Sequence, residues 1–303
     1  MEKSRLYQLF NDKNFGKVLF DEPMKNHTSF KIGGPADVLI IPENEEEIVG
    51  AIKFCRENQI KYFVMGNGSN LLVKDTGIRG VVIKIANGFD RIDVVENRVI
   101  CEGGALLSKV AKYALRHSLT GFEFASGIPG TIGGAIAMNA GAYGGEMKDV
   151  VSKVKAMDKN NNIVELINEQ MNFRYRGSIV GDENLIVLGV ELKLEEGEYS
   201  SIEEKMKDLT NRRVSKQPLE YPSAGSTFKR PEGYFAGKLI DDAGLRGVRY
   251  GDAQVSEKHC GFIINAGEAT YEQVITLIKM IQKVVYDKFN VVLEPEVKIV
   301  GDD

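Results

Sequence analysis

Glycine carries the clearest chemical signal in this sequence. Residues 66–70 and residues 126–135 are two segments in which glycine is mixed with small or polar residues. A backbone without side chains lets a ligand approach closely, and successive amide N–H groups can converge on phosphate oxygens. The two segments therefore favour the binding of a phosphorylated ligand.

The first segment reads Gly-Asn-Gly-Ser-Asn and follows an apolar run at 62–65 that is expected to form a strand. It is not the dinucleotide fingerprint of Rossmann proteins, because Leu71 stands where the third glycine would be and no helical pattern follows. A plain tight turn and a phosphate-binding loop both agree with this segment.

The second segment contains Pro129, which could open a short helix that runs through about Asn139. The N-terminus of such a helix would add partial positive charge for a phosphate without any lysine. Close packing of a helix on a sheet would explain the same small residues. The two segments together predict that this half of the chain binds a nucleotide.

Thiol and metal chemistry find little support. Cys55, Cys101 and Cys260 form no C-x-x-C pair, so we interpret them as buried small hydrophobic residues in a reducing cytoplasm. The three histidines stand far apart and lack the spacing of metal ligands; they are His27, His117 and His259.

The composition is that of a globular protein with two or three domains, since 43% of its 303 residues are hydrophobic. A net charge of −4, without a basic stripe, argues against nucleic-acid binding. Residues 1–14 lack the apolar stretch of a signal peptide, and no run approaches the length of a membrane span. We therefore expect a cytoplasmic protein.

Strands and helices alternate in the first half. Strands are expected at 36–41, 62–65, 81–85, 151–157 and 185–194, and a hairpin at 92–101 with its turn at 96–97. Asn44 and three glutamates predict the start of a helix, and a second amphipathic helix follows the hairpin. The apolar faces of these helices are Ile48, Ala51, Ile52 and Cys55, and Leu107, Val110, Ala111, Ala114 and Leu115.

The second half begins near a predicted joint at 195–203. Ser200 with Glu203, and Thr270 with Gln273, have the spacing of capping boxes. They predict one helix that ends near Lys216 and a long helix with one apolar face, formed by Val274, Leu277, Ile278, Ile281 and Val285. The closing segment, residues 291–300, is predicted to be a strand.

Six motifs in one order resemble the UDP-N-acetylenolpyruvoylglucosamine reductase (MurB) family. They run from about residue 26 to residue 300, nearly the whole chain. They are Asn-His-Thr-Ser-Phe-Lys-Ile-Gly-Gly (26–34), the segment 66–70, Gly-Ile-Pro-Gly (127–130) with Asn-Ala-Gly-Ala-Tyr-Gly (139–144), Tyr-Arg (175–176), Ala-Gly-Ser-Thr-Phe-Lys (224–229) and Leu-Glu-Pro-Glu-Val (293–297).

The resemblance implies an α+β protein. Its FAD-binding domain would be of the two-part vanillyl-alcohol-oxidase (PCMH) type, followed by an α/β substrate-binding domain. We place the two FAD-binding subdomains at 1–85 and 86–199, and the substrate-binding domain at 200–303. Non-covalent FAD would carry hydride from NADPH to C3 of UDP-N-acetylglucosamine enolpyruvate and give UDP-N-acetylmuramate. This is a step of peptidoglycan precursor synthesis, and hence of cell-wall growth, shape and division. NADPH would use the same cleft as the sugar nucleotide at a different time, and we expect a monomer.

Three catalytic positions of the family match Arg176, Ser226 and Glu296. A guanidinium suits the stabilisation of an enolate, because it stays charged and can bind a carboxylate through two bonds. Ser226 would give a proton to C2, and Glu296 would assist the enolate. Glu294 is the alternative to Glu296, since alternation along a strand puts both side chains on the same side.

Further residues follow from the same resemblance. The FAD-binding positions are Gly66, Asn67, Gly68, Ser69, Asn70, Ser126, Gly127, Pro129, Gly130, Thr131, Ile132, Gly133, Asn139 and Gly141. The substrate-binding positions are Tyr175, Arg213, Lys216 and Arg230. The chain between Arg176 and Ser226 is too short for the inserted tyrosine loop of one family type. We therefore expect the shorter type. Whether any tyrosine covers the diphosphate in it stays open, and the candidates are Tyr143, Tyr175 and Tyr221.

Two other functions agree with parts of the pattern. One is an FAD oxidase of the same broad fold, whose flavin would be attached covalently to His27. The other is a non-catalytic flavin- or nucleotide-binding module. The latter has no need of the three residues Arg176, Ser226 and Glu296.

Overall fold

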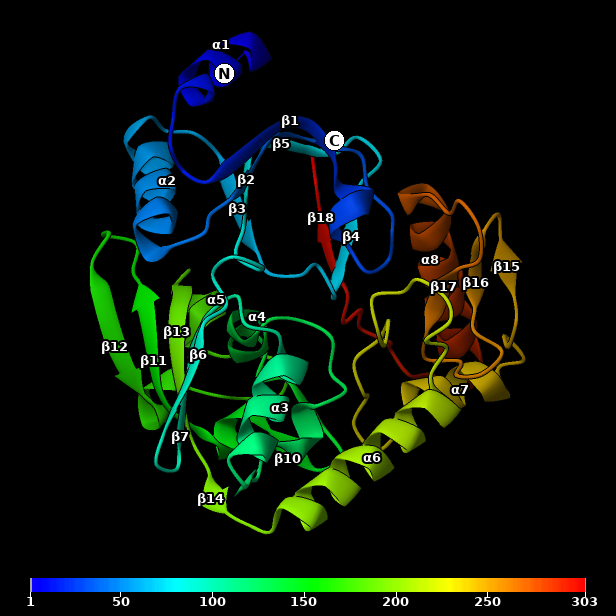
Figure 1. Ribbon diagram of the computed structural model, residues 1–303. Helices are drawn as coiled ribbons and strands as arrows, with labels where there is room; N and C mark the ends of the chain where they lie inside the picture. The colour runs from blue at the N-terminus through cyan, green and yellow to red at the C-terminus, as the bar shows by residue number, and fades with distance from the viewer. Residues whose placement is uncertain (1, 303) are drawn as a thin grey trace. The chain divides into compact units, whose positions relative to one another are not determined.

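A computed structural model describes residues 2–302 and combines helices with several small sheets (Figure 1). The first sheet has the strand order β1-β2-β5-β3, in which β3 and β5 are parallel. Helices α1 (Lys3–Asn11) and α2 (Glu45–Glu57) belong to the same part of the sequence. The strands are β1 (Lys17–Pro23), β2 (Pro35–Ile41), β3 (Tyr62–Met65) and β5 (Ile78–Lys84).

Helix α2 forms where its sequence predicts it. The side chain of Asn44 accepts a hydrogen bond from the Glu47 amide, and three glutamates occupy the first turn at the positive end of the helix dipole. The four residues predicted to face inward, from Ile48 to Cys55, are all buried. Local capping and apolar spacing are therefore sufficient to explain this element.

A five-stranded antiparallel sheet of order β12-β11-β13-β7-β6 carries the core of the first compact unit. The predicted hairpin is confirmed as β6 and β7, with Glu96 in the left-handed region at its turn. Helices α3 and α4 contact this sheet (Figure 1). Apolar side chains from these helices and strands form one buried cluster. The elements are β6 (Ile92–Val95), β7 (Arg98–Glu102), β11 (Val151–Met157), β12 (Ile163–Ile167), β13 (Ile186–Lys193), α3 (Leu107–Arg116) and α4 (Ile132–Ala137).

Helix α3 turns the predicted apolar face inward, although Leu115 is only half-buried. Short elements complete this unit. They are β8 (Leu119–Thr120) paired with β14 (Glu195–Glu196), β9 (Gly141–Ala142) paired with β10 (Gly145–Glu146), and α5 (Ile179–Asp182).

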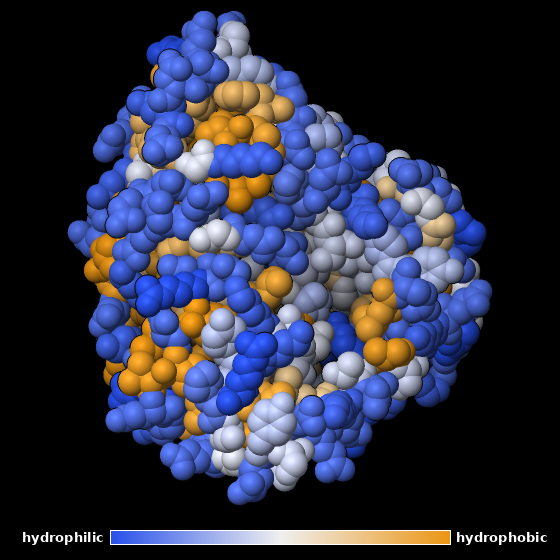
Figure 2. All heavy atoms as spheres, viewed as in Figure 1, coloured by the Kyte–Doolittle hydropathy of each residue, from blue (hydrophilic) through white to orange (hydrophobic). Residues whose placement is uncertain are grey.

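Helix α6 (Tyr199–Lys216) is long and mostly exposed, with Ile202 and Leu209 as its buried residues. Figure 2 shows mainly hydrophilic residues over the part of the surface where this helix lies. The predicted capping box at Ser200 is wrong, because the helix already begins at Tyr199 and Ser200 lies inside its first turn.

The second compact unit has a small antiparallel sheet and a long helix. The sheet has the order β15-β16-β17, and α8 contacts two of its strands. A parallel pair is formed by β4 and β18. The elements are β4 (Leu71–Val73), α7 (Ala236–Asp242), β15 (Arg249–Tyr250), β16 (Ala253–Val255), β17 (Ile263–Asn265), α8 (Tyr271–Phe289) and β18 (Lys298–Val300).

Helix α8 confirms the predicted capping box. The Thr270 side chain accepts from the Gln273 amide, and the Gln273 side chain accepts from the Thr270 amide. All five residues of the predicted apolar face, from Val274 to Val285, are buried. Asn290 in the left-handed conformation ends the helix.

The closing strand is shorter than predicted. Only Lys298–Val300 forms a strand, whereas Pro295 makes an isolated antiparallel bridge with Phe228. Proline cannot donate a ladder hydrogen bond, which explains why residues 291–297 do not continue the strand.

Among the described residues, 2–19, 39–67 and 81–213 form the first unit, and 20–38, 68–80 and 214–302 form the second. The mixture of helices with mainly antiparallel sheets confirms the predicted α+β class. The finer division into three domains at 85 and 199 stays a prediction.

The two capping sites give a matched pair of variants. We expect Thr270→Ala to lower the free energy of unfolding by about 1 kcal/mol, because it removes a cap that bonds a helix amide. Ser200→Ala should change it by less than about 0.5 kcal/mol, since Ser200 is an interior helix residue. Urea denaturation of both variants measures the difference. An equal loss for both would contradict the observed start of α6.

Candidate cofactor and active site

The two glycine segments predicted from the sequence meet in the first unit. Gly66 directly follows β3, and a Cβ atom on it would lie 2.3 Å from Oγ1 of Thr131. Any larger residue at position 66 would therefore collide with the Thr131 side chain. Thr131 is itself held in place, because Oγ1 accepts a hydrogen bond from the Gly134 amide at the start of α4.

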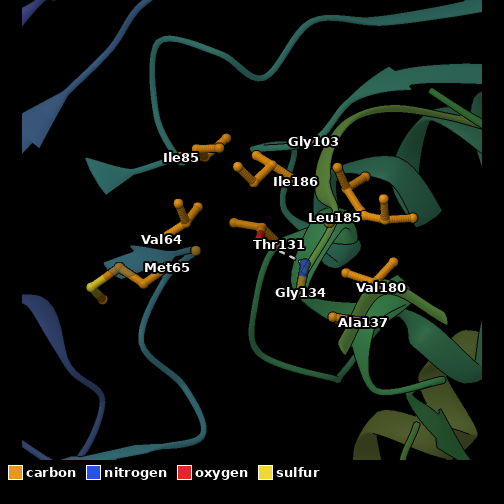
Figure 3. A pocket seen from close by; sticks show the side chains of 13 residues that line it. Val64, Met65, Ile85, Gly103, Thr131, Gly134, Ala137, Val180, Leu185 and Ile186 are labelled. Carbon is orange, nitrogen blue, oxygen red and sulfur yellow. Dashed lines mark hydrogen bonds between the residues drawn. The ribbon is translucent and has the colours of Figure 1, made fainter. Parts of the chain in front are cut away.

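A pocket with a volume of about 130 Å³ lies at this junction. Figure 3 shows Val64 and Met65 from β3 on one side, with Thr131 and Ala137 on the other. Most of its lining is apolar or glycine, which suits a flat, weakly polar ring rather than a charged group. Its lining residues are Val64, Met65, Gly66, Ile85, Gly103, Thr131, Gly133, Gly134, Ala137, Val180, Leu185, Ile186 and Val187.

The N-terminus of α4 does not offer its first amides to a phosphate. The Ile132 amide donates to the Ala105 carbonyl at 2.8 Å, and the Gly133 amide donates to the Gly103 carbonyl at 2.9 Å. The Gly134 amide is used by Thr131. The predicted helix opening at Pro129 is wrong, because Thr131 is the N-cap and α4 covers only Ile132–Ala137.

Positive charge near this segment comes from a side chain instead. A Cβ atom on Gly127 would lie 3.1 Å from Cδ of Arg213, so the arginine stem packs directly on the glycine. Burial lowers the pKa of Arg213, while the neighbouring Tyr143 phenol acts in the opposite direction. Within residues 2–302, the Arg213 guanidinium makes no ion pair or hydrogen bond.

Ser126 presents a second unsatisfied group beside Gly127. Its Oγ atom is buried and has no hydrogen-bond partner among the described residues. A buried hydroxyl normally finds a partner, and a half-buried cation normally has an anion. Ser126 and Arg213 therefore fit a polar, negatively charged ligand next to Gly127.

Glu123 holds the turn that leads into this segment. Its carboxylate is almost fully buried and accepts hydrogen bonds from Thr120 Oγ1 at 2.6 Å and from Lys205 Nζ at 3.1 Å. The Gly121 amide bonds both of its oxygens. Burial would raise the pKa of Glu123, but these hydrogen bonds outweigh burial and lower the pKa below its usual 4.5.

Arg176 lies at the tip of a tight turn in the first unit. Arg174 and Gly177 exchange two backbone hydrogen bonds, of 3.0 and 3.1 Å, so that Tyr175 and Arg176 are the two central residues. Arg176 has a φ of 55°, in the left-handed region that costs a non-glycine residue about 1 kcal/mol. Its guanidinium lies over the exposed Tyr175 ring, 5.2 Å from the centroid.

Asn139 and Gly141 support this part of the structure. The Asn139 amide nitrogen donates to Glu146 Oε2 at 2.8 Å and to the Arg174 carbonyl at 3.2 Å. Its oxygen accepts from the Lys148 amide. The Asn139 side chain is thus fully used by the protein, and Gly141 pairs with Glu146 in the β9–β10 hairpin.

Ser226 and Glu296 come together through backbone bonds in the second unit. The Glu296 amide donates to the Thr227 carbonyl at 2.8 Å, one residue after Ser226. Thr227 is buried and its Oγ1 accepts from the Ile263 amide. Ser226 is therefore held on one side, while a Cβ atom on the preceding Gly225 would meet nothing within 4 Å. The space beside the serine is open.

The other end of the first glycine segment reaches the same place. Asn70 Nδ2 donates to the Glu296 carbonyl at 3.1 Å, and the Asn70 carbonyl accepts from the Lys298 amide at 2.9 Å. Gly68 accepts from the Ser29 amide. Glu296 is half-buried, whereas Glu294 is exposed and paired with Lys229 at 3.1 Å. The Glu294 carboxylate therefore takes part in an ion pair at the surface.

The remaining predicted substrate residues are exposed. Lys216 is the last residue of α6. Arg230 bonds the Tyr234 carbonyl and lies 4.0 Å from the centroid of the Phe235 ring. The three tyrosines considered for covering a diphosphate are all exposed; they are Tyr143, Tyr175 and Tyr221.

Comparison with known proteins agrees with these features. Residues 36–167 match the family described as FAD binding domain, and residues 217–300 match the family described as UDP-N-acetylenolpyruvoylglucosamine reductase, C-terminal domain. A protein named UDP-N-acetylenolpyruvoylglucosamine reductase from Caldanaerobacter subterraneus subsp. tengcongensis is 58% identical over 287 residues, 95% of each chain. One of the same name from Clostridioides difficile is 56% identical, over 94% of each chain. The chain belongs to the UDP-N-acetylenolpyruvoylglucosamine reductase family.

A crystal structure of a member of this reductase family, from Thermus caldophilus, has the same fold. The TM-score is 0.80 at 35% identity, and the similarity covers 93% of this chain and 98% of the other. The predicted fold class is confirmed, and the chain is a flavin-dependent oxidoreductase with FAD as its cofactor. Within residues 2–302, no helix combines the length and apolar character that crossing a membrane requires.

Membership in the reductase family also decides between the alternative functions. It replaces the prediction of an FAD oxidase, and His27, the candidate for covalent flavin, contacts Glu22 at 2.9 Å. The three cysteines are buried and unpaired. Burial raises the pKa of the Cys55 thiol to about 12 and that of Cys101 and Cys260 as well. Their interpretation as small hydrophobic residues is confirmed.

Three residues of this reductase site had no functional prediction from the sequence. Glu123 and Lys205 connect the segment before Ser126 to α6, and Asp182 binds Arg174 beside the Arg176 turn. Thr120 and Glu123 have the spacing of a capping box, and this spacing is a local signal that could have pointed to Glu123. Asp182 has no such signal, because its ion pair with Arg174 depends on the tertiary position of the turn at residues 174–177.

Glu123 should stabilise the reductase in a pH-dependent way. Its folded-state pKa is lower than its usual 4.5, so its stabilisation is present above that value and is lost as the pH falls through the folded-state pKa. We expect Glu123→Gln to lower the free energy of unfolding by about 1.5–3 kcal/mol at neutral pH. The difference should shrink below pH 4.5. Urea denaturation at several pH values measures both.

Glu203→Gln is the control, because Glu203 is an exposed carboxylate on α6 that pairs with Lys207. It should change stability by less than about 1 kcal/mol. A Glu123→Gln deficit that stays constant down to about pH 3 would contradict the assignment.

Proposed function

We propose that this chain reduces UDP-N-acetylenolpyruvoylglucosamine to UDP-N-acetylmuramate with NADPH, in peptidoglycan precursor synthesis. The names of its relatives support the substrate. The observation that carries the proposal is the junction of the two glycine segments, where Gly66 meets Thr131 and unsatisfied polar groups flank Gly127. NADPH as the donor, the cytoplasm as the location and a monomeric state belong to the same proposal.

The first unit has the features needed to hold FAD. The apolar pocket beside Gly66 and Thr131 suits the adenine ring, and the orphaned Ser126 hydroxyl and Arg213 guanidinium suit an anionic part of the cofactor. Arg213, predicted to bind substrate, is therefore proposed as a cofactor residue. Within this unit the backbones of residues 66–67 and 126–131 provide the rest, and no covalent attachment is needed.

Bound FAD supplies hydride transfer, from NADPH and then to C3 of the enolpyruvyl group. The protein must then stabilise the enolate that forms beside the substrate carboxylate and must deliver a proton to C2. We assign the first task to Arg176, whose charge stays fixed and whose fork can bind two oxygens. Arg176 has an unfavourable left-handed backbone conformation in this turn, and such strained residues are common at functional sites.

Ser226 is assigned as the proton donor to C2. Its hydroxyl forms no hydrogen bond with another described residue, and the open space at Gly225 gives a ligand access to it. Glu296 is assigned to assist the enolate. Its backbone is held by hydrogen bonds to Thr227 and Asn70, which fixes the position from which its side chain extends. Lys216, Arg230 and Tyr175 are proposed to bind the sugar nucleotide.

Two additions to the yellow protein under argon test this function. NADPH should bleach the flavin absorbance, and the enolpyruvyl sugar nucleotide should restore it. Ser226→Ala should bleach at the normal rate, because the proton to C2 is needed only later. The return of colour should slow by roughly 10²–10⁴, the usual contribution of a general acid. Ser226→Cys should keep more activity, since a thiol can still give a proton.

The control for this variant is Ser223→Ala, in the same loop, where Ser223 bridges to Ile264 through the backbone. It should leave both steps unchanged. Bleaching and colour return slowed equally by Ser226→Ala would make Ser226 a cofactor-site residue, and failure of the substrate to restore colour would reject the function.

Arg213 gives a separate test of the cofactor site. Removing a half-buried charge that binds an anion should weaken FAD by about 10- to 100-fold, which corresponds to a charged hydrogen bond of about 1.5–3 kcal/mol. We expect this loss for Arg213→Gln, measured by flavin fluorescence on the apoprotein. Arg212→Gln is the control, because Arg212 is exposed and paired with Asp208. Equal FAD affinities of the two variants would argue against the role of Arg213.

A further inference from the structure

The turn that carries Arg176 is held by side-chain contacts in addition to the backbone hydrogen bonds that close it. It is closed by the two backbone hydrogen bonds between Arg174 and Gly177, but these alone do not determine how the turn is directed. Three side-chain contacts attach it to the rest of the unit, and none of them involves Arg176 itself.

The first anchor is a bidentate ion pair. Arg174 Nη1 and Nη2 bind the two carboxylate oxygens of Asp182 at 2.9 and 2.6 Å. The planar fork restricts rotation about the contact more than a single bond would. Gly177 allows this arrangement, because a Cβ atom there would lie 3.1 Å from Cζ of Arg174.

The second anchor comes from Asn139, which is 1% exposed. It donates to the Arg174 carbonyl at 3.2 Å, so it binds the same residue from the backbone side. Its second hydrogen goes to Glu146 and its oxygen accepts from Lys148, which leaves no donor on the side chain for a ligand. Asn139 therefore acts on the turn rather than through its side chain on the cofactor.

The third anchor is Ser178, whose Oγ donates to the Ala137 carbonyl at 3.1 Å at the end of α4. The turn is thus held at both ends. A left-handed, non-glycine residue persists only where its surroundings determine the backbone strongly. The three anchors determine the backbone around Arg176 in this way.

We infer that Asn139 and the Arg174–Asp182 pair are positioning residues that hold the turn so that Arg176 is presented in one direction. The inference rests on the role proposed for Arg176. Asn139 was predicted to bind FAD, whereas this inference makes it a residue that positions Arg176 for stabilisation of the enolate.

Asp182→Asn is the main test, because Asp182 is 43% exposed and the change keeps its size. We expect bleaching by NADPH to stay within about twofold, and the return of colour with the enolpyruvyl nucleotide to slow about tenfold, the equivalent of one hydrogen bond at the transition state. Arg174→Lys keeps the charge but loses the planar fork. Its rate of colour return should therefore lie between that of the unmodified protein and that of Asp182→Asn. Asp208→Asn is the matched control, since Asp208 forms an exposed pair with Arg212 on α6.

The dependence on Arg176 is decided by a double variant. Asp182→Asn should have no further effect in an Arg176→Gln background, because a positioning residue acts only through the group it positions. Amide hydrogen exchange of residues 173–178 should be faster in Asp182→Asn and in Asn139→Asp, which reports loosening independently of turnover.

Three outcomes would overturn the inference. They are an Asp182→Asn variant with normal colour return, an equal slowing of both steps, and a full tenfold effect that persists without Arg176. If Arg176→Gln itself restores colour at the normal rate, the proposed role of Arg176 fails and the positioning role fails with it. If only the Asp182 and Asn139 variants behave normally, the proposed function stands and the inference alone is rejected.

Discussion

Helix α4 is docked on the chain at residues 103–107 by three backbone hydrogen bonds, and the ligand-binding features of the first unit depend on this contact. The Ile132 and Gly133 amides bond the carbonyls of Ala105 and Gly103, and the Leu107 amide bonds that of Gly130. Such close approach requires glycine, since a Cβ atom on Gly133 would lie 2.9 Å from the Gly103 oxygen. It places Thr131 against Gly66 and so creates the pocket between β3 and α4.

Because α4 is docked in this way, positive charge for an anionic ligand must come from a side chain and not from the helix N-terminus. Because the first amides of α4 are already used, the helix cannot bind an anion in the way that free N-terminal amides do. A chain with a net charge of −4 then needs a local cation, and Arg213 provides one without a carboxylate partner among the described residues. The Glu123 carboxylate is bonded by Lys205 and by two other donors, the Thr120 hydroxyl and the Gly121 amide, so it does not compete for this guanidinium.

The proposed catalytic side chains lie on irregular segments that are nevertheless held firmly. Ser226 adjoins Thr227, whose amide, carbonyl and hydroxyl are all bonded, and Glu296 follows the bridge between Phe228 and Pro295. Arg176 lies in a turn with side-chain anchors on both sides. Loops carry function most effectively when a rigid scaffold determines their conformation. Here backbone hydrogen bonds hold the segments of Ser226 and Glu296, and side-chain hydrogen bonds hold the turn of Arg176.

Local features of this protein could be predicted from its sequence. The Asn44 and Thr270 caps, the apolar faces of α2 and α8 and the β6–β7 hairpin depend on residues a few positions apart, and the order of the motifs was sufficient to indicate the family. The start of α4 at Ile132, the use of its amides, the saturation of Asn139 and the exposed pairing of Glu294 were decided by tertiary structure. Each depends on a partner distant in the sequence, such as Gly103 for Gly133 or Lys229 for Glu294. Propensity and periodicity describe how a segment can fold, but which polar groups remain available to a ligand is settled only after distant segments have formed their hydrogen bonds.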